Sequence, residues 1–144
     1  MAQNVSPLDT AHQGPIHAAS LDHFGRRLAT AADDNSVRVW DLETRCFLAE
    51  LQGHKGSVWA VVWAHPRYGP LLSSAGEDRC VLLWREAEGE WCQVHRHELE
   101  GAVLSIAFSP WEYGLQLAAA CSDSQVVVLS LSEDAERAGK AVVE

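Results

Sequence analysis

The most constraining feature of this chain is a turn aspartate that recurs three times at a nearly fixed interval. Asp34, Asp78 and Asp123 each precede a short apolar run, and they lie 44 residues (34 to 78) and 45 residues (78 to 123) apart. A period of this length indicates one supersecondary unit that is used three times and buries its apolar faces against its neighbours. The repeat therefore constrains the fold more strongly than any local propensity does.

Three further positions recur in register with these aspartates. A bulky apolar side chain follows six residues later, a small residue comes four residues earlier, and a third position lies four residues before the first apolar run of each copy. In chain order these positions hold Trp40, Trp84 and Leu129; Thr30, Ser74 and Ala119; and His12, His54 and Leu99. The third copy thus keeps its aspartate but has apolar residues at the other three positions.

Each copy predicts a four-stranded antiparallel sheet. The expected strands are short, rich in β-branched residues or Trp, and separated by turns of Gly, Pro, Asp and Ser, which favours an all-β fold. The innermost runs are continuously apolar, as is typical of twisted sheets that stack face to face around an axis. The expected strands are 16–21, 27–32, 37–41 and 46–51, then 58–64, 71–75, 81–85 and 91–96, then 103–109, 117–121 and 126–131, with a doubtful twelfth at 140–143.

Charge and composition exclude several classes of function. The chain has 20 acidic and 11 basic residues, a formal net charge of −9, which argues against nucleic acid or an anionic membrane as a direct partner. No run approaches the 18 or so apolar residues of a membrane span, and the N-terminus does not resemble a secretory signal. The four cysteines lack C-x-x-C spacing and are expected to be reduced thiols of a cytosolic protein.

One group of residues has the composition of a hydrolase triad. His54, Ser74 and Asp78 have the right side-chain types, and His12, Thr30 and Asp34 repeat the arrangement in the first copy. A catalytic triad does not need to occur twice at the register of a fold repeat, and it needs a reachable nucleophile beside an oxyanion site. No Gly-x-Ser-x-Gly motif is present. We therefore expect a structural network, no enzymatic activity, no small-molecule substrate and no cofactor.

Other candidate sites have a simpler structural interpretation. His95 and His97 would share one face of a strand and could bind a metal, but no third ligand has suitable spacing. An acidic cluster lacks the register of a calcium loop and is expected to be a solvated rim. It comprises Glu86, Glu88, Glu90, Glu98 and Glu100. Trp111 is expected either to anchor an interface or to pack on Tyr113.

The Gly53-His54 and Trp40-Asp41 dipeptides, together with the turn aspartates, resemble the WD-repeat β-propeller family. The resemblance implies that each copy is a four-stranded blade with a buried tetrad of His, Ser or Thr, Asp and Trp. The tetrads would be His12, Thr30, Asp34 and Trp40; then His54, Ser74, Asp78 and Trp84; and, in the degenerate third copy, Asp123 alone. A buried indole N–H needs an acceptor such as a hydroxyl, which can in turn donate to an imidazole.

Two loops carry a more specific resemblance. The segments 63–69 (WAHPRYG) and 108–114 (FSPWEYG) follow the innermost strands of the second and third copies and look like the Sec-thirteen branch of the family. That branch supplies the small propeller of the COPII outer coat and of the nuclear-pore Y-complex. The resemblance implies a scaffold on the cytosolic face of the endoplasmic reticulum, on COPII vesicles or at the nuclear pore. A peptide-binding adaptor that uses the ring face is the alternative.

The resemblance also implies a partner and a surface that accepts it. The partner would be a helical-solenoid coat subunit or a nucleoporin that donates an extra blade to the open ring by adding a sheet to the first repeat. The residues expected to bind it are Ile16, Ala18, Ser20, Arg38 and Trp40, with Trp111 as a further interface residue.

Three blades amount to half of an open six-bladed propeller. The expected organisation is an N-terminal extension (1–11), WD repeats at 12–52, 53–96 and 97–131, and a divergent tail (132–144) that forms a solvated loop or a charged helical turn. The outward faces of the first and third blades are expected to carry Val37, Val39, Val126 and Val128. Because uncapped repeats expose apolar surface, the chain should oligomerise, aggregate, or require a partner's blade or a second three-blade copy.

Overall fold

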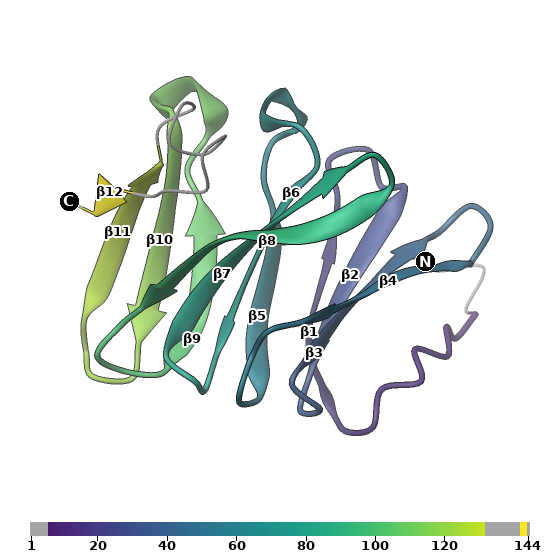
Figure 1. Cartoon of the computed structure of the whole chain (residues 1–144), viewed down its shortest axis with the longest axis horizontal. Helices are drawn as coiled ribbons and strands as arrows, with labels where there is room; N and C mark the ends of the chain where they lie inside the picture. The colour runs from purple at the N-terminus through teal and green to yellow at the C-terminus, as the bar shows by residue number, and fades with distance from the viewer. Residues whose placement is uncertain (1–5, 132–141, 144) are drawn as a thin grey trace, which may run out of the picture.

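The structure, a computed structural model, describes residues 6–131 and 142–143 and contains three four-stranded antiparallel sheets, which confirms the expected all-β fold (Figure 1). In every sheet the strands are hydrogen-bonded in chain order. We call the sheets blades 1, 2 and 3. Blade 1 comprises β1 (Ile16–Leu21), β2 (Arg27–Ala32), β3 (Ser36–Asp41) and β4 (Phe47–Gln52); blade 2 comprises β5 (Val58–Trp63), β6 (Leu71–Gly76), β7 (Cys80–Ala87) and β8 (Glu90–Glu98); blade 3 comprises β9 (Val103–Phe108), β10 (Leu115–Cys121), β11 (Val126–Leu131) and β12 (Val142–Val143).

The last strand of blade 3 is the one whose existence the sequence leaves doubtful. β12 pairs with β11 at Leu129 and Ser130, so it falls inside the stretch that was expected to be a tail. The rest of that stretch, with its expected loop or helical turn, lies outside the described residues.

Two short 3-10 helices, η1 (Pro66–Tyr68) and η2 (Trp111–Tyr113), follow the first strands of blades 2 and 3. Within the described ranges, no helix is long and apolar enough to cross a membrane.

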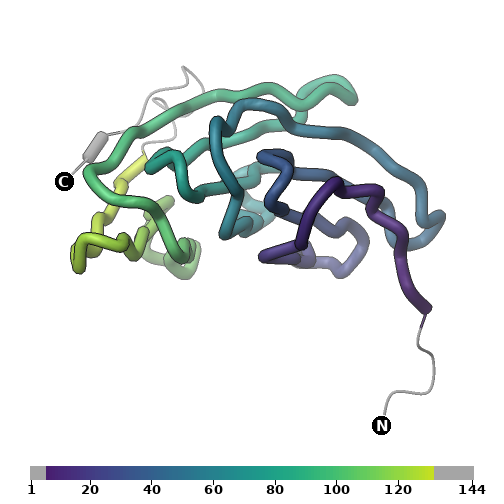
Figure 2. Tube along the Cα trace, turned by 90° about the horizontal axis from the view of Figure 1, so that it is seen from below, coloured from purple at the N-terminus to yellow at the C-terminus, as the bar shows by residue number. Residues whose placement is uncertain are grey.

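The blades stand side by side in a curved row (Figures 1 and 2). The first strands β1, β5 and β9 contact one another in turn along the inner side of the row, while β4 and β8 run along its outer side (Figure 2). Residues from 6 onward lie beside blade 1 at one end of the row. This arrangement gives blade 2 a neighbour on both sides and gives blades 1 and 3 one described neighbour each.

The recurrent aspartates form the same turn in all three blades. The Oδ1 atom of Asp34, of Asp78 and of Asp123 accepts a hydrogen bond from the backbone N–H two residues later, each at 3.2 Å. The residue after each aspartate has a positive φ, namely 66° at Asn35, 65° at Arg79 and 68° at Ser124. An aspartate side chain that binds its own backbone stabilises such a tight turn between strands. The period of the sequence is therefore the period of this turn.

Each blade has two distinct faces, which are set by strand pairing. One face, called the tetrad face, carries Trp40, Trp84 or Leu129. The other, called the valine face, carries Val37 and Val39 in blade 1, Val81 and Leu83 in blade 2, and Val126 and Val128 in blade 3. The apolar clusters join the valine face of blade 1 to the tetrad face of blade 2, and the valine face of blade 2 to the tetrad face of blade 3.

This stacking corrects one expectation about the outward surfaces. Val37 and Val39 are 0% exposed because they pack against blade 2, so the outward surface of blade 1 is its tetrad face and not its valine face. Val126 and Val128 occupy the same register in blade 3 and are 70% and 40% exposed, as expected for an outward surface. The direction of stacking, tetrad face onto the preceding valine face, decides which face is free at each end. Alternation within a strand does not reveal that direction.

Candidate functional site

The tetrad of blade 2 is a closed hydrogen-bond network. Trp84 Nε1 donates to Ser74 Oγ at 2.8 Å, and Ser74 Oγ lies 2.7 Å from His54 Nε2. His54 Nδ1 lies 3.0 Å from Asp78 Oδ2. Because the indole can only donate, the Ser74 hydroxyl accepts from it and donates to the imidazole, whose Nδ1–H then donates to the carboxylate. Every polar group of the network has a partner, which makes a buried polar network stable.

This network has a structural geometry rather than that of a catalytic triad. Ser74 is fully buried, and its hydroxyl is occupied by both the indole and the imidazole. Asp78 also accepts hydrogen bonds from the backbone N–H groups of Lys55 and Cys80. The network therefore ties the loop before β5 to the turn between β6 and β7. A nucleophile that has no open side cannot reach a substrate carbonyl.

In blade 1 only three of the four tetrad residues are linked. His12 Nε2 lies 2.8 Å from Thr30 Oγ1, and His12 Nδ1 lies 2.9 Å from Asp34 Oδ2. Trp40 Nε1 is buried without a hydrogen-bond partner, so the expected bond from Trp40 to Thr30 is not formed. The physical difference from blade 2 is the neighbour. Trp84 is pressed against its own sheet by blade 1, whereas no described sheet covers Trp40, which packs edge to face on Phe47.

The third copy has lost the network and kept the turn. Leu99, Ala119 and Leu129 pack together in the apolar cluster between blades 2 and 3. Replacing all partners of a buried hydrogen bond by apolar groups costs little, whereas removing one partner leaves another unsatisfied. Asp123 remains as the turn residue that accepts the Gln125 N–H.

The tetrad aspartates are held in their charged form. Burial opposes the charge of Asp34, but hydrogen bonds from the Ser36 hydroxyl, the Gln13 backbone N–H and His12 outweigh it and keep the pKa of Asp34 far below its usual value. Burial likewise opposes the charge of Asp78, and the hydrogen bond from His54 together with backbone N–H groups lowers its pKa. Donors that point at a carboxylate stabilise the anion.

The tetrad face of blade 1 is the candidate binding surface. Phe47 pairs with Trp40 across β3 and β4 and is 48% exposed, and Leu21, which pairs with Leu28, is 57% exposed. Arg38 lies on the same face, two residues before Trp40 on β3, where its guanidinium stacks over Phe47 and bonds to Glu50 and to the Thr10 carbonyl. The face thus presents apolar side chains around a charge that is compensated within the blade.

The structure places the five expected acceptor residues on two different faces. Arg38, Trp40 and the half-exposed Ile16 belong to the tetrad face. Ala18 and Ser20 pair with Ala31 and Ala29, which face blade 2, so these two lie on the valine face and not on the outward surface. A β-bulge between Ile16 and Ala18 inserts one residue and reverses the alternation of β1. Ala19 and Leu21 take the outward positions instead.

Polar contacts between blades were not anticipated from the sequence. Arg27 of blade 1 forms a bidentate ion pair with Glu86 of blade 2, with Nη–Oε distances of 3.0 and 3.2 Å. Trp63 Nε1 donates to the Ser20 carbonyl at 2.9 Å. These groups lie about 40 to 60 residues apart in the chain, and single-sequence patterns contain no signal for such pairs.

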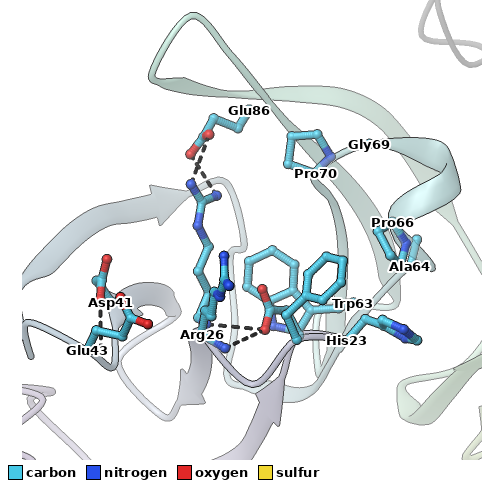
Figure 3. Close-up of a pocket in the computed structure, with 13 residues that line it drawn as sticks. His23, Arg26, Asp41, Glu43, Trp63, Ala64, Pro66, Gly69, Pro70 and Glu86 are labelled. Atoms are coloured by element: carbon cyan, nitrogen blue, oxygen red, sulfur yellow. Dashed lines mark hydrogen bonds and ion pairs between the residues drawn. The ribbon is translucent and has the colours of Figure 1, made fainter.

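A cleft opens between blades 1 and 2 at the rim that carries the η1 loop (Figure 3). It has a volume of about 520 Å³ and is lined by Phe24, Trp63, prolines and charged groups that include the Arg27–Glu86 pair. On the same rim, Trp111 lies against His65, with ring centroids 5.6 Å apart, and under the Arg67 guanidinium. Trp111 is partly exposed and contacts these residues of blade 2.

The histidine pair and the acidic rim contact residues of blades 1 and 2. His95 and His97 stack with ring centroids 6.2 Å apart. Glu86 and Glu98 from the acidic rim pair with Arg27 and Arg79. Across the part of the chain that the structure describes, no group of three or more His, Cys, Asp or Glu side chains could hold a metal ion.

The two tryptophans provide a matched test of the network. Trp84→Phe removes a donor from Ser74 and should lower the free energy of unfolding by about 1–3 kcal/mol. Trp40→Phe removes an indole N–H that has no partner, so it should cost clearly less. Urea unfolding of both variants measures the difference. Equal losses of stability would contradict a structural role for the hydrogen bond of Trp84.

The lowered pKa values of Asp34 and Asp78 predict a contribution to acid sensitivity. A carboxylate with a depressed pKa in the folded state adds stability above its unfolded pKa of about 3.9, and this contribution is lost as the pH falls toward the folded value. Asp78→Asn should therefore be less stable than the parent at neutral pH, and the gap should narrow as the pH falls below about 4. Unfolding free energies measured across that range would contradict this account if the gap stayed constant.

Comparisons with known proteins agree with this geometry. The family model described as WD domain, G-beta repeat matches residues 5–41 and 45–85. The protein SEC13 homolog of Drosophila melanogaster is 39% identical over 137 residues, which covers 93% of this chain and 38% of that protein. Protein transport protein SEC13 of Coccidioides immitis is 36% identical over 143 residues, which covers 93% of this chain and 46% of that protein.

The fold has a counterpart among solved structures. The β-propeller domain of Cps50 (Swd1) from Myceliophteria thermophila superposes with a TM-score of 0.72 at 27% sequence identity, covering 85% of this chain and 37% of that one. The chain spans less than half the length of the curated relatives described above. It belongs to the WD40-repeat β-propeller family, and its sequence is similar to the SEC13 proteins of that family.

Proposed function

We propose that this chain is a scaffold component of a SEC13-type membrane-coat assembly, in which the tetrad face of blade 1 accepts a sheet from a helical partner. Relatives named protein transport protein support the transport role. The partner would be the large helical subunit of the COPII outer coat or the corresponding nucleoporin, at the endoplasmic reticulum, on vesicles or at the nuclear pore.

The observation that carries this proposal is the state of the first tetrad face. The equivalent faces of blades 2 and 3 are covered by a preceding blade, and their Trp84 and Leu129 are almost fully buried in apolar clusters. On blade 1 the same face exposes Leu21 and Phe47, and Trp40 retains an unpaired N–H. A sheet donated by the partner would pack on this face and cover the exposed Leu21 and Phe47 side chains, and covering apolar surface of this kind removes an aggregation hazard.

Capture of the partner tests the proposal directly. The tagged chain should co-purify with the helical partner in a 1:1 ratio when both are co-expressed, and deletion of the partner's sheet-donating segment should abolish capture. Leu21→Asp and Phe47→Asp place charges on exposed positions of the tetrad face, and each should reduce capture at least tenfold because a charge would be buried. Val126→Asp on blade 3 is the matched control and should leave capture unchanged.

Three results would contradict the proposal: a complex that survives deletion of the partner's segment, capture that is insensitive to the Leu21 and Phe47 substitutions, and equal sensitivity to Val126→Asp. Circular dichroism of each variant should show the parent's β-sheet signal, so that loss of capture reports on the surface rather than on folding.

The cleft between blades 1 and 2 supports a second candidate function, a peptide-binding adaptor. Its volume of about 520 Å³ lies within the range of ligand pockets, and Phe24 lies exposed at its border. The two candidates differ in their response to Phe24→Ala. A peptide adaptor would lose its captured peptides, whereas a scaffold that accepts a sheet on blade 1 would keep its helical partner.

A further inference from the structure

Two polar contacts hold the walls of the cleft between blades 1 and 2 at a fixed separation. One is the bidentate ion pair between Arg27 of blade 1 and Glu86 of blade 2. The other is the hydrogen bond that the Trp63 indole of blade 2 donates to the Ser20 carbonyl of blade 1. Every lining residue belongs to these two blades and the turns within them. The cleft is thus formed before any ligand arrives, which lowers the cost of binding.

The charges that line this cleft do not balance. Its acidic side chains are Asp22, Asp41, Glu43 and Glu86, and its basic ones are Arg26 and Arg27. Four acidic against two basic side chains give the lining a net charge of −2, with His23 neutral. Because Arg27 and Glu86 neutralise each other, three carboxylates remain against the guanidinium of Arg26. A ligand for this cleft should therefore be positively charged.

We infer that the cleft binds the arginine side chain of a partner peptide. Arginine suits it better than lysine, because a flat guanidinium stacks on aromatic rings and bonds a carboxylate through two N–H groups at once. The cleft already shows both geometries within the chain. Arg26 lies over the Phe24 ring, 5.9 Å from its centroid, and Arg27 is bidentate on Glu86. This arginine site rests on the second candidate function, the peptide adaptor, and names the side chain that the adaptor would bind.

The carboxylates of Asp41 and Glu43 are the expected partners of this arginine. Asp41 ends β3, and Glu43 follows in the turn to β4, on the side of the cleft opposite Pro66 (Figure 3). The Oδ1 atom of Asp41 accepts the backbone N–H groups of Glu43 and Thr44 at 2.9 and 3.1 Å. These bonds hold the carboxylate in place and leave Oδ2 for a ligand. The Glu43 side chain is exposed beside it.

A row of aromatic rings continues from the cleft along the same rim, which favours a peptide over a single amino acid. His23 lines the cleft and lies 5.0 Å from His65, whose ring lies 5.6 Å from that of Trp111 in blade 3, measured between centroids. Trp111 is 38% exposed. Apolar residues next to the bound arginine can lie on these rings, since aromatic side chains supply large contact areas. The site would thus recognise an arginine with an apolar neighbour.

A nuclear magnetic resonance titration of the 144-residue chain tests this inference. The probe is a short alanine peptide with one central arginine and a leucine on either side of it. The matched control peptide has citrulline in place of arginine, which keeps the shape of the side chain and removes its charge. The arginine peptide should shift the indole N–H signal of Trp63, and the citrulline peptide should bind at least about tenfold more weakly.

Variants of the protein identify the carboxylates. Asp41→Asn keeps an oxygen that accepts the N–H groups of the turn, and Glu43→Gln changes an exposed side chain, so both should fold like the parent. The double variant should bind the arginine peptide at least about tenfold more weakly, and it should no longer distinguish arginine from citrulline. Glu100→Gln removes an exposed carboxylate outside the cleft and should leave the affinity unchanged.

Each other outcome overturns the inference. Equal binding of the arginine and citrulline peptides shows that charge does not select the ligand, and it leaves the peptide adaptor standing. Equal losses in Glu100→Gln and in the double variant show attraction to the acidic chain as a whole. A Trp63 signal that no peptide shifts removes both the arginine site and the peptide adaptor. The scaffold function is tested separately, because the double variant should still capture the helical partner.

Discussion

The contact between a valine face and the following tetrad face is the interaction on which the rest of this structure depends. A single four-stranded sheet with two apolar faces has no core of its own, so its stability comes from burial against its neighbours. Blade 2 illustrates the complete case, with Val81 and Leu83 on one side and Leu82 and Trp84 on the other, all buried. Blades 1 and 3 show the same surfaces with one neighbour absent among the described residues.

The tetrad is a consequence of this stacking as well as a support for it. In blade 2 the indole N–H of Trp84 reaches Ser74 beneath a covering sheet, and the network is closed. In blade 1 His12, Thr30 and Asp34 hold the turn in the same way, but Trp40 is not joined to them. The turn therefore forms within one blade, whereas the indole bond is present in the blade whose tetrad face a neighbouring sheet covers. This dependence links local hydrogen bonding to assembly.

Much of the fold could be predicted from the sequence because its signals are local and repeated. The turn at Asp34, Asp78 and Asp123 and the short strands around it recur at one period. The last strand of blade 3, Val142–Val143, lies where the repeat pattern is lost, so the sequence offers only a short apolar run as a signal for it. The direction in which blades stack could not be read from alternation, so Val37 and Val39 were assigned to the wrong surface. The bulge after Ile16 likewise moved Ala18 and Ser20 to the covered face, since one inserted residue inverts every later side chain.

The central claim is that a covering sheet completes the tetrad, and hydrogen exchange of the two indole N–H groups tests it most directly. Nuclear magnetic resonance of the chain should show slow exchange for Trp84, whose N–H is bonded to Ser74, and faster exchange for Trp40, whose N–H is buried but has no hydrogen-bond partner. Covering blade 1 should then slow the exchange of Trp40. Equal protection of both indoles in the uncovered monomer would contradict this account.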